Sequence, residues 1–131
     1  MTIVVGFVPT KEGRAALARA AEEARGRHSR LVVVNSHRST GDAHDDSARE
    51  AETEIQQVAD GLSGDGVEVE VRRLGRGNEP AEDLIAAAAE TDADLIVIGL
   101  RRRTPVGKLI LGSNAQRILL DAPCAVLAVK G

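Results

Sequence analysis

The sequence is nearly devoid of aromatic residues and of cysteine. Phe7 is the one aromatic side chain in 131 residues, so the core must be built from Val, Ile, Leu and Ala, which suit helices packed closely on a sheet. The single cysteine, Cys124, excludes an internal disulfide and fits a reducing compartment. It follows Pro123 in an apolar stretch, which favours a buried, inert thiol over a reactive one.

Long hydrophobic runs and a strong excess of charge are also missing. No apolar run approaches the roughly 20 residues of a membrane span, and the N-terminal sequence MTIVVGFVP lacks the features of a signal peptide. The formal net charge of −3 gives no reason to expect nucleic-acid binding. We therefore expect one soluble, cytoplasmic domain over residues 1–131, with neither a membrane nor a nucleic acid as partner.

Apolar strands alternate with helical patterns along the whole chain. Strands are expected at 2–8, 31–34, 67–71, 94–98 and 124–129, and helices at 11–27, at 45–62, after Asn78 and after Gly112. Such alternation implies parallel pairing through right-handed crossovers. The sequence thus predicts an α/β fold with a doubly wound five-stranded parallel sheet and helices on both faces. Alternation alone does not determine the strand order, which we take to be 3-2-1-4-5. Thr10 and Asn78 are expected to cap the first and third helices.

In that strand order the switch point lies between the first and fourth strands, and ligands of doubly wound sheets bind at this point. It is bounded by the loops 7–10 and 99–113. The second loop holds three arginines and leads through Gly112 and Ser113 into a helix. The first N–H groups of a helix lack partners and carry partial positive charge, so the sequence favours an anion there.

Two phosphate-binding motifs can be rejected. A Walker loop fails because Gly107-Lys108 is followed by Leu109 and because Arg102 stands where its first glycine should be. A dinucleotide fingerprint at Gly75–Gly77 fails because Pro80 stands at the third glycine position, so a plain turn is the better interpretation.

Residues for metal binding or catalysis are not apparent. His28, His37 and His44 show no ligand spacing with one another or with Cys124, and no arrangement of side chains suggests a nucleophile or an acid–base pair. We therefore expect no metal site, name no catalytic residue and do not expect an enzyme. The triplet Arg101–Arg103 could grip a phosphate or be a solvated run of charge, and the sequence leaves both possibilities open.

Three stretches of the chain resemble the universal stress protein family: IVVGFVPTKEGRAALARA, NEPAEDLIAAAAETDADLIVIG and GSNAQRILLDAPCAVLAVK. The resemblance covers nearly the whole length. It implies the five-stranded, adenine nucleotide alpha hydrolase-like fold, a homodimer, and the binding of ATP or AMP without a well-defined catalytic role.

Nucleotide-binding members of that family carry Gly, two residues, Gly, nine residues, then Gly-Ser or Gly-Thr. Gly99, Gly112 and Ser113 fit this spacing, whereas Arg102 replaces the second glycine. Val8 replaces the family's Asp at the end of the first strand. The loss of one such acceptor costs on the order of 1 kcal/mol, so we expect a Kd for ATP weaker than about 10 μM.

The candidate nucleotide contacts follow from this resemblance and from the strand ends at the switch point. They are Phe7, Val8, Val34, Gly99, Arg102, Gly112, Ser113 and Asn114. Three functions remain open at this stage: a stress-response module that weakly binds an adenine nucleotide, a dimer that acts through protein contacts without nucleotide, and, with least support, a slow nucleotide hydrolase.

The last strand predicts how two copies would associate. It is apolar at almost every position and lies at an edge of the predicted sheet, where unpaired N–H and C=O groups invite another strand. A two-fold axis would make that pairing antiparallel, with Val126, Leu127 and Val129 near the axis. The opposite edge is expected to be protected by the charges of Glu68, Glu70, Arg72 and Arg73.

Overall fold

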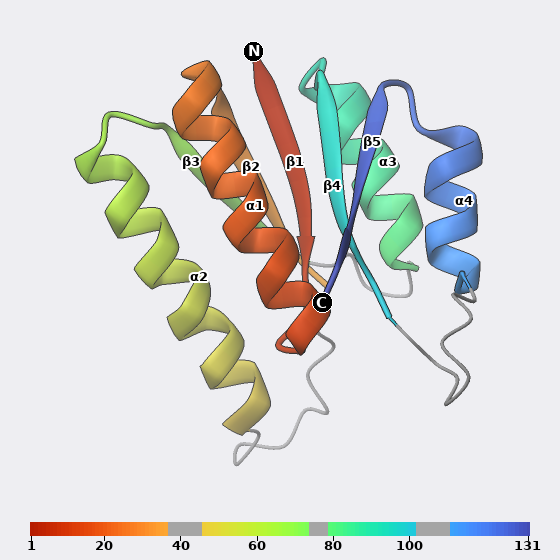
Figure 1. Cartoon of the computed structure of the whole chain (residues 1–131), viewed down its shortest axis with the longest axis horizontal. Coiled ribbons are helices and arrows are strands. Elements are labelled where there is room, and N and C mark those ends of the chain that lie inside the picture. The colour runs from red at the N-terminus through yellow and green to blue at the C-terminus, as the bar shows by residue number, and fades with distance from the viewer. Residues whose placement is uncertain (37–45, 74–78, 102–110) are drawn as a thin grey trace.

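The computed structural model describes residues 1–36, 46–73, 79–101 and 111–131 (Figure 1). Strands and helices alternate along the chain in the order β1 (Thr2–Phe7), α1 (Lys11–Arg27), β2 (Arg30–Asn35), α2 (Asp46–Gly64), β3 (Val69–Arg73), α3 (Pro80–Glu90), β4 (Leu95–Leu100), α4 (Ser113–Asp121) and β5 (Ala125–Lys130).

The five strands form one parallel sheet in the order β3-β2-β1-β4-β5, which confirms the predicted topology. Helices α1 and α2 cover one face, and α3 and α4 lie on the other (Figure 1). Successive residues of a strand point to opposite faces. Accordingly, Ile3 and Val5 of β1 join the core beneath α1 and α2, whereas Val4 joins the core beneath α3.

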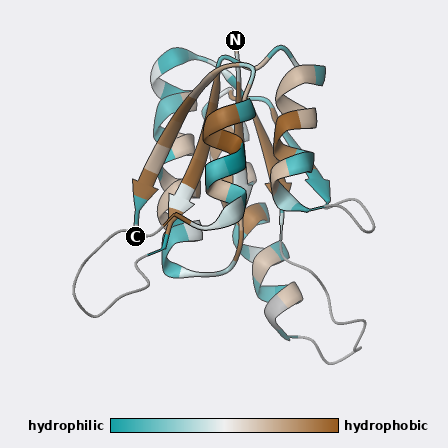
Figure 2. Ribbon diagram, turned by 90° about the vertical axis from the view of Figure 1, so that its right-hand side faces the viewer, coloured by the Kyte–Doolittle hydropathy of each residue, from teal (hydrophilic) through white to brown (hydrophobic). Residues whose placement is uncertain are grey.

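The inner strands are apolar because both of their faces are covered. Val4, Val32 and Ile96 are fully buried, and in Figure 2 these strands are hydrophobic while the helices also carry hydrophilic residues. Small side chains on α1, such as Ala16 and Ala20, let the helix pack closely on the sheet. Among the described helices, none combines the length and the apolar character that a membrane-spanning segment requires.

The helix starts agree in part with the predicted caps. The Oγ1 atom of Thr10 accepts a hydrogen bond from the Gly13 N–H at 3.1 Å, as expected for the N-cap of α1. The predicted cap Asn78 lies outside the described residues. Helix α3 follows Glu79, whose side chain makes no cap hydrogen bond, and Pro80 occupies its first turn.

Two predictions about the edge elements were wrong in detail. Strand β3 begins at Val69, not at Val67, because the Val67 N–H bonds the Leu62 carbonyl and thereby belongs to the turn that ends α2. The helical pattern that follows Gly112 in the sequence places Ile118 and Leu119 on one face, yet Leu119 is 44% exposed while Ile118 is buried. Helix α4 packs mainly against α3, so only a narrow stripe of it is covered.

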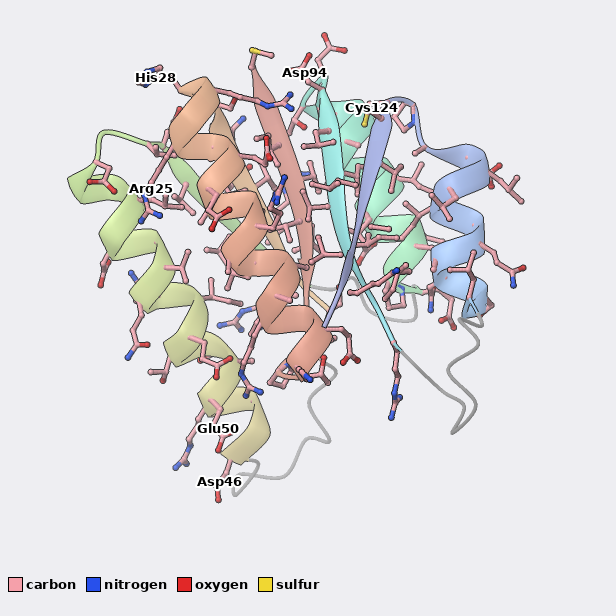
Figure 3. All side chains as sticks on the ribbon, viewed as in Figure 1. Arg25, His28, Asp46, Glu50, Asp94 and Cys124 are labelled. Atoms are coloured by element: carbon pink, nitrogen blue, oxygen red, sulfur yellow. The ribbon has the colours of Figure 1, made fainter. Side chains whose placement is uncertain are left out.

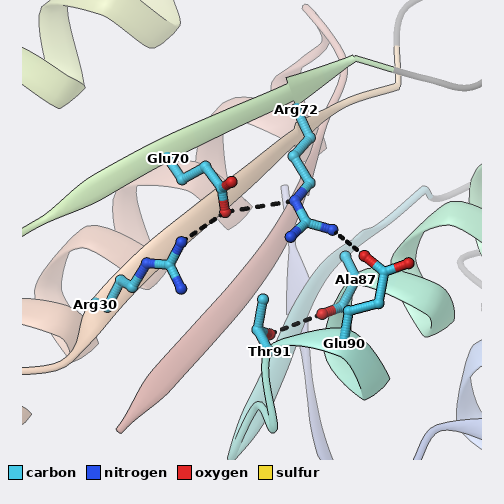
Figure 4. A network of polar contacts seen from close by, with 6 residues as sticks. All are labelled: Arg30, Glu70, Arg72, Ala87, Glu90 and Thr91. Carbon is cyan, nitrogen blue, oxygen red and sulfur yellow. Dashed lines mark hydrogen bonds and ion pairs between the residues drawn. The ribbon is translucent and has the colours of Figure 1, made fainter.

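The outer edge of β3 carries paired charges, as predicted. Glu70 accepts a hydrogen bond from Arg30 of β2 at 2.7 Å and lies 3.4 Å from the Nε atom of Arg72 (Figure 4). Arg72 in turn donates to Glu90 of α3 at 2.6 Å, and this hydrogen bond raises the pKa of the Arg72 guanidinium above its ordinary value. The network joins β2, β3 and α3 and keeps the edge polar.

Candidate functional site

Strands β1 and β4 separate before they end. Pairing between them runs only from Ile3–Leu95 to Val5–Val97, whereas β1 pairs with β2 along its whole length. Beyond this point a cavity of about 350 Å³ opens between the two strand ends. Its floor includes Gly6 and Ile98, and the structure thus places a cavity at the predicted switch point.

Gly6 shapes the floor of this cavity. A Cβ atom at Gly6 would lie 2.9 Å from Cδ1 of Leu84, which also lines the cavity. The missing side chain therefore lets α3 approach β1 closely and close the floor with an apolar group.

The starts of three helices form the cavity walls: Glu12 and Gly13 in α1, Pro80 in α3, and Gly112 to Ala115 around the start of α4. The first turn of a helix offers unpaired N–H groups and partial positive charge. The three helices differ in how these groups are used.

Side chains of the protein already cap two of the three helix starts. Thr10 caps α1, and the Oδ1 atom of Asn114 accepts a hydrogen bond at 3.1 Å from the N–H of Ala81 in α3. Gly112, the N-cap of α4, is extended and offers no side chain. Helix α4 is therefore the one of these three whose first N–H groups are not satisfied by a side-chain cap and face a lined cavity.

Asn114 was predicted to contact the nucleotide, and the structure gives its side chain a second task. By capping α3 from α4, its amide joins the two helix starts on the same side of the cavity. Gln116 fixes the preceding segment, because its Nε2 atom donates to the Leu111 carbonyl at 2.9 Å. The wall at the start of α4 is thus held by hydrogen bonds on both sides.

Gly99 lines the cavity, and its lack of a side chain has a packing reason. A Cβ atom at Gly99 would collide with the carbonyl oxygen of Glu12, and one at Gly13 would collide with the carbonyl oxygen of Val8. The first turn of α1 therefore rests directly on the ends of β1 and β4. These two glycines bring Glu12 to the rim of the cavity.

Two charged residues occur in the described lining, Glu12 and Arg101. Glu12 is half-buried and Arg101 is exposed. Within the described part of the chain neither side chain forms an ion pair, so both charges remain available to a ligand.

The structure brings together five of the eight predicted nucleotide contacts: Val8, Gly99, Gly112, Ser113 and Asn114. The side chains of Phe7 and Val34 lie elsewhere. Phe7 is fully buried in the core beneath α1 and α2, and Val34 is buried on the opposite face of the sheet. The face of the sheet to which each of these two side chains points follows from the alternation of side chains along a strand. Arg102 lies outside the described residues.

Several lining residues were not foreseen, among them Glu12 and Ser36. Ser36 follows β2, and its N–H bonds the carbonyl of Phe7, so the chain leaving β2 stays beside the end of β1. The position of Glu12 in the first turn after the switch-point loop was the available signal. The predicted contacts were residues at strand ends and in the glycine motif, and Glu12 belongs to neither group.

The opposite end of the sheet carries the other residues of chemical interest. Figure 3 places His28, Asp94 and Cys124 where the strands begin, away from the cavity. Cys124 is half-buried, not fully buried as predicted, and burial followed by the charge of Asp94 raises the pKa of its thiol. A raised pKa keeps the thiol protonated and unreactive. No group of acidic, His and Cys side chains in the described ranges could hold a metal ion.

Comparison with known proteins gives consistent matches over the whole chain. The family model described as "Universal stress protein family" matches residues 1–130. A universal stress protein of Mycolicibacterium smegmatis is 44% identical over 128 residues, which cover 98% of this chain and 96% of the relative.

Solved structures agree with this match. A universal stress protein from Archaeoglobus fulgidus superposes with a TM-score of 0.77 at 38% identity, covering 99% of this chain and 98% of the other. A universal stress protein from the same organism in complex with dAMP superposes with a TM-score of 0.71 at 34% identity, again over 99% and 98% of the two chains.

Proposed function

The chain belongs to the universal stress protein family, and on this premise we propose that it is a binding module that holds an adenine nucleotide in the cavity between β1 and β4. The observation that carries the proposal is the start of α4, which has no side-chain cap and forms a wall of that cavity. The relative in complex with dAMP supports the choice of an adenine nucleotide as ligand.

In this proposal the phosphate lies at the N–H groups of Ser113, Asn114 and Ala115. These groups and the helix dipole supply hydrogen bonds and partial positive charge without any further cation. Arg101 stands on the same cavity and adds a full positive charge.

The nucleoside would occupy the apolar part of the cavity. Val8, Leu84, Ile98 and Leu111 line it, and a volume of about 350 Å³ lies near the lower end of the range for small-molecule pockets, about 300–1,000 Å³. Ser36 and Glu12 offer polar atoms near this part. The space and the mixture of apolar and polar lining thus suit one nucleoside with a short phosphate group.

The proposed affinity is modest. Val8 offers no side-chain acceptor at the end of β1, and one missing hydrogen bond costs on the order of 1 kcal/mol. We therefore propose a Kd for ATP weaker than about 10 μM. A slow hydrolase has less support, because the described lining holds no His, Cys or Lys, and the Glu12 carboxylate is the one general base among the described lining residues.

A charge at the start of α4 tests this function. Ser113→Asp places a carboxylate in the first turn, where it favours the helix but repels a phosphate. Calorimetry with AMP should show binding at least about tenfold weaker than in the wild type, while the melting temperature does not fall. The matched neutral variant Ser113→Asn should bind within about threefold of the wild type. Equal binding by Ser113→Asp and the wild type would place the phosphate elsewhere.

A second proposal concerns the homodimer, through which a function by protein contacts would act. Val126, Leu127 and Val129 of β5 are only half-buried in the single chain, whereas Ile96 and Val97 of the neighbouring β4 are fully buried. Leu120 of α4, the helix that precedes β5 in the chain, is 83% exposed. Antiparallel pairing of β5 with its copy would cover these apolar groups and satisfy the free edge.

A further inference from the structure

We propose that Glu12 makes the cavity selective for adenine nucleotides of low charge, so that a monophosphate is favoured over a triphosphate. This inference rests on the proposed function and narrows it to a class of ligand. It follows from three observations: the place of Glu12 on the cavity, the fixed position of its backbone, and the absence of a described partner for its carboxylate.

Close packing determines where Glu12 stands. Its backbone lies against Gly99 at the end of β4 and against Gly131, where a Cβ atom would be 2.7 Å from both Cα and N of Glu12. The neighbouring Gly13 N–H is held by Thr10 at 3.1 Å. Helix α1 can therefore not move away from the cavity without losing these contacts, and a ligand must accept a carboxylate at its rim.

The charge of Glu12 is not cancelled by a neighbour within the described structure. Glu23 of the same helix, by contrast, is paired: it lies 3.1 Å from Arg19 and 3.0 Å from Arg27. Glu12 has no such pair in the described ranges, and Arg101 is the single cation among the described lining residues. Among the described lining residues, each phosphate added to a ligand therefore meets one positive charge, that of Arg101, and one negative charge, that of Glu12.

The cavity is small enough for this carboxylate to act on the whole ligand. A sphere of about 350 Å³ is roughly 9 Å across, close to the Debye length of about 8 Å at physiological salt, so a group bound in the cavity lies within about that distance of Glu12. Adenosine is neutral, AMP carries roughly two negative charges and ATP roughly four. Repulsion by Glu12 therefore grows along this series, while the start of α4 can satisfy only the phosphate next to it.

The test compares adenosine, AMP and ATP on wild type and Glu12→Gln by calorimetry. The variant has the same shape without the charge, so its affinity should rise about tenfold for ATP, about threefold for AMP and not measurably for adenosine. The gain for ATP should shrink in high salt, because the effect is one of charge. Glu22→Gln is the matched control: it removes the same charge from an exposed site on the same helix and should leave all three affinities unchanged.

A second variant, which removes the positive charge of Arg101 instead of the negative charge of Glu12, distinguishes an effect of charge from a loss of folding. Arg101 is exposed, so Arg101→Gln should keep the fold, and it should weaken the binding of ATP more than the binding of AMP.

Three results would overturn the proposed selectivity. If Glu12→Gln weakened the binding of all three ligands equally, Glu12 would be a hydrogen-bond acceptor for the nucleoside. Equal gains in Glu12→Gln and Glu22→Gln would assign the effect to net charge and overturn it as well. Binding of AMP with no change in Glu12→Gln would overturn the selectivity and leave the nucleotide function intact, whereas no binding of any ligand would overturn both.

Discussion

Gly99 and Asn114 occupy positions that a nucleotide motif would explain, yet both also have structural tasks. Gly99 lacks a side chain because the carbonyl of Glu12 fills the space that a Cβ atom would need. Asn114 uses its side-chain oxygen to cap α3 through Ala81, 33 residues away in the sequence. The sequence could locate both residues at the site but not these tasks, because each depends on a partner brought close only by the fold.

The cap made by Asn114 can be tested separately from ligand binding. Asn114→Ala leaves the N–H of Ala81 without its acceptor, and the loss of an N-cap typically costs about 1 kcal/mol. Urea denaturation should show this fall in the free energy of unfolding. Asn114→Asp keeps an acceptor oxygen at the same place and should remain as stable as the wild type. If Asn114→Ala proves as stable as the wild type, the hydrogen bond between α4 and α3 contributes nothing to the free energy of unfolding.

At the scale of elements, the two edge strands of the sheet differ in the side chains that they carry. Strand β3 carries Glu70 and Arg72 in a network with β2 and α3 (Figure 4). Strand β5 carries apolar, half-buried side chains up to Lys130. The sequence predicted both edges from their charge. It could not predict that Leu119 is exposed, because the periodicity of α4 gives its apolar residues but not how far α3 covers them.

One substitution on each edge tests the proposed dimer. Val126→Lys adds a charge to β5 and should yield a monomer, since a charged side chain would be desolvated at a paired edge. Val71→Lys makes the same change on β3, where Val71 is already 46% exposed, and should leave the mass unchanged. Mass is read by light scattering at micromolar concentration. A monomeric wild type, or a Val126→Lys variant that stays dimeric, would contradict pairing through β5.

Over the whole molecule, the sequence predicted the fold far better than the details of the site. Continuous apolar strands such as Leu31 to Val34 and the cap at Thr10 are local signals, and the structure confirms both. The lining of the cavity depends instead on where loops and helix starts converge. For this reason the side chains of Phe7 and Val34 turn out to face the core, while Glu12 was overlooked.

The two ends of the sheet carry different features. The carboxyl ends of the strands hold the cavity and an uncapped helix start, whereas His28 and Cys124 lie at the amino ends (Figure 3). Binding at the first end leaves the edge at β5 free. A nucleotide and a second copy of the chain can therefore be bound at the same time in the proposed arrangement.

Titration of the isotope-labelled protein with AMP, followed by nuclear magnetic resonance of its backbone amides, tests the nucleotide site most directly. If the phosphate is bound by the start of α4, the amide signals of Ser113, Asn114 and Ala115 should shift most. Those of Gly99 and Gly6 should follow, because they line the same cavity. The amide of Arg72 on β3 and that of His28 at the amino ends should not move. Shifts centred on these two residues, or none at millimolar AMP, would contradict a nucleotide site between β1 and β4.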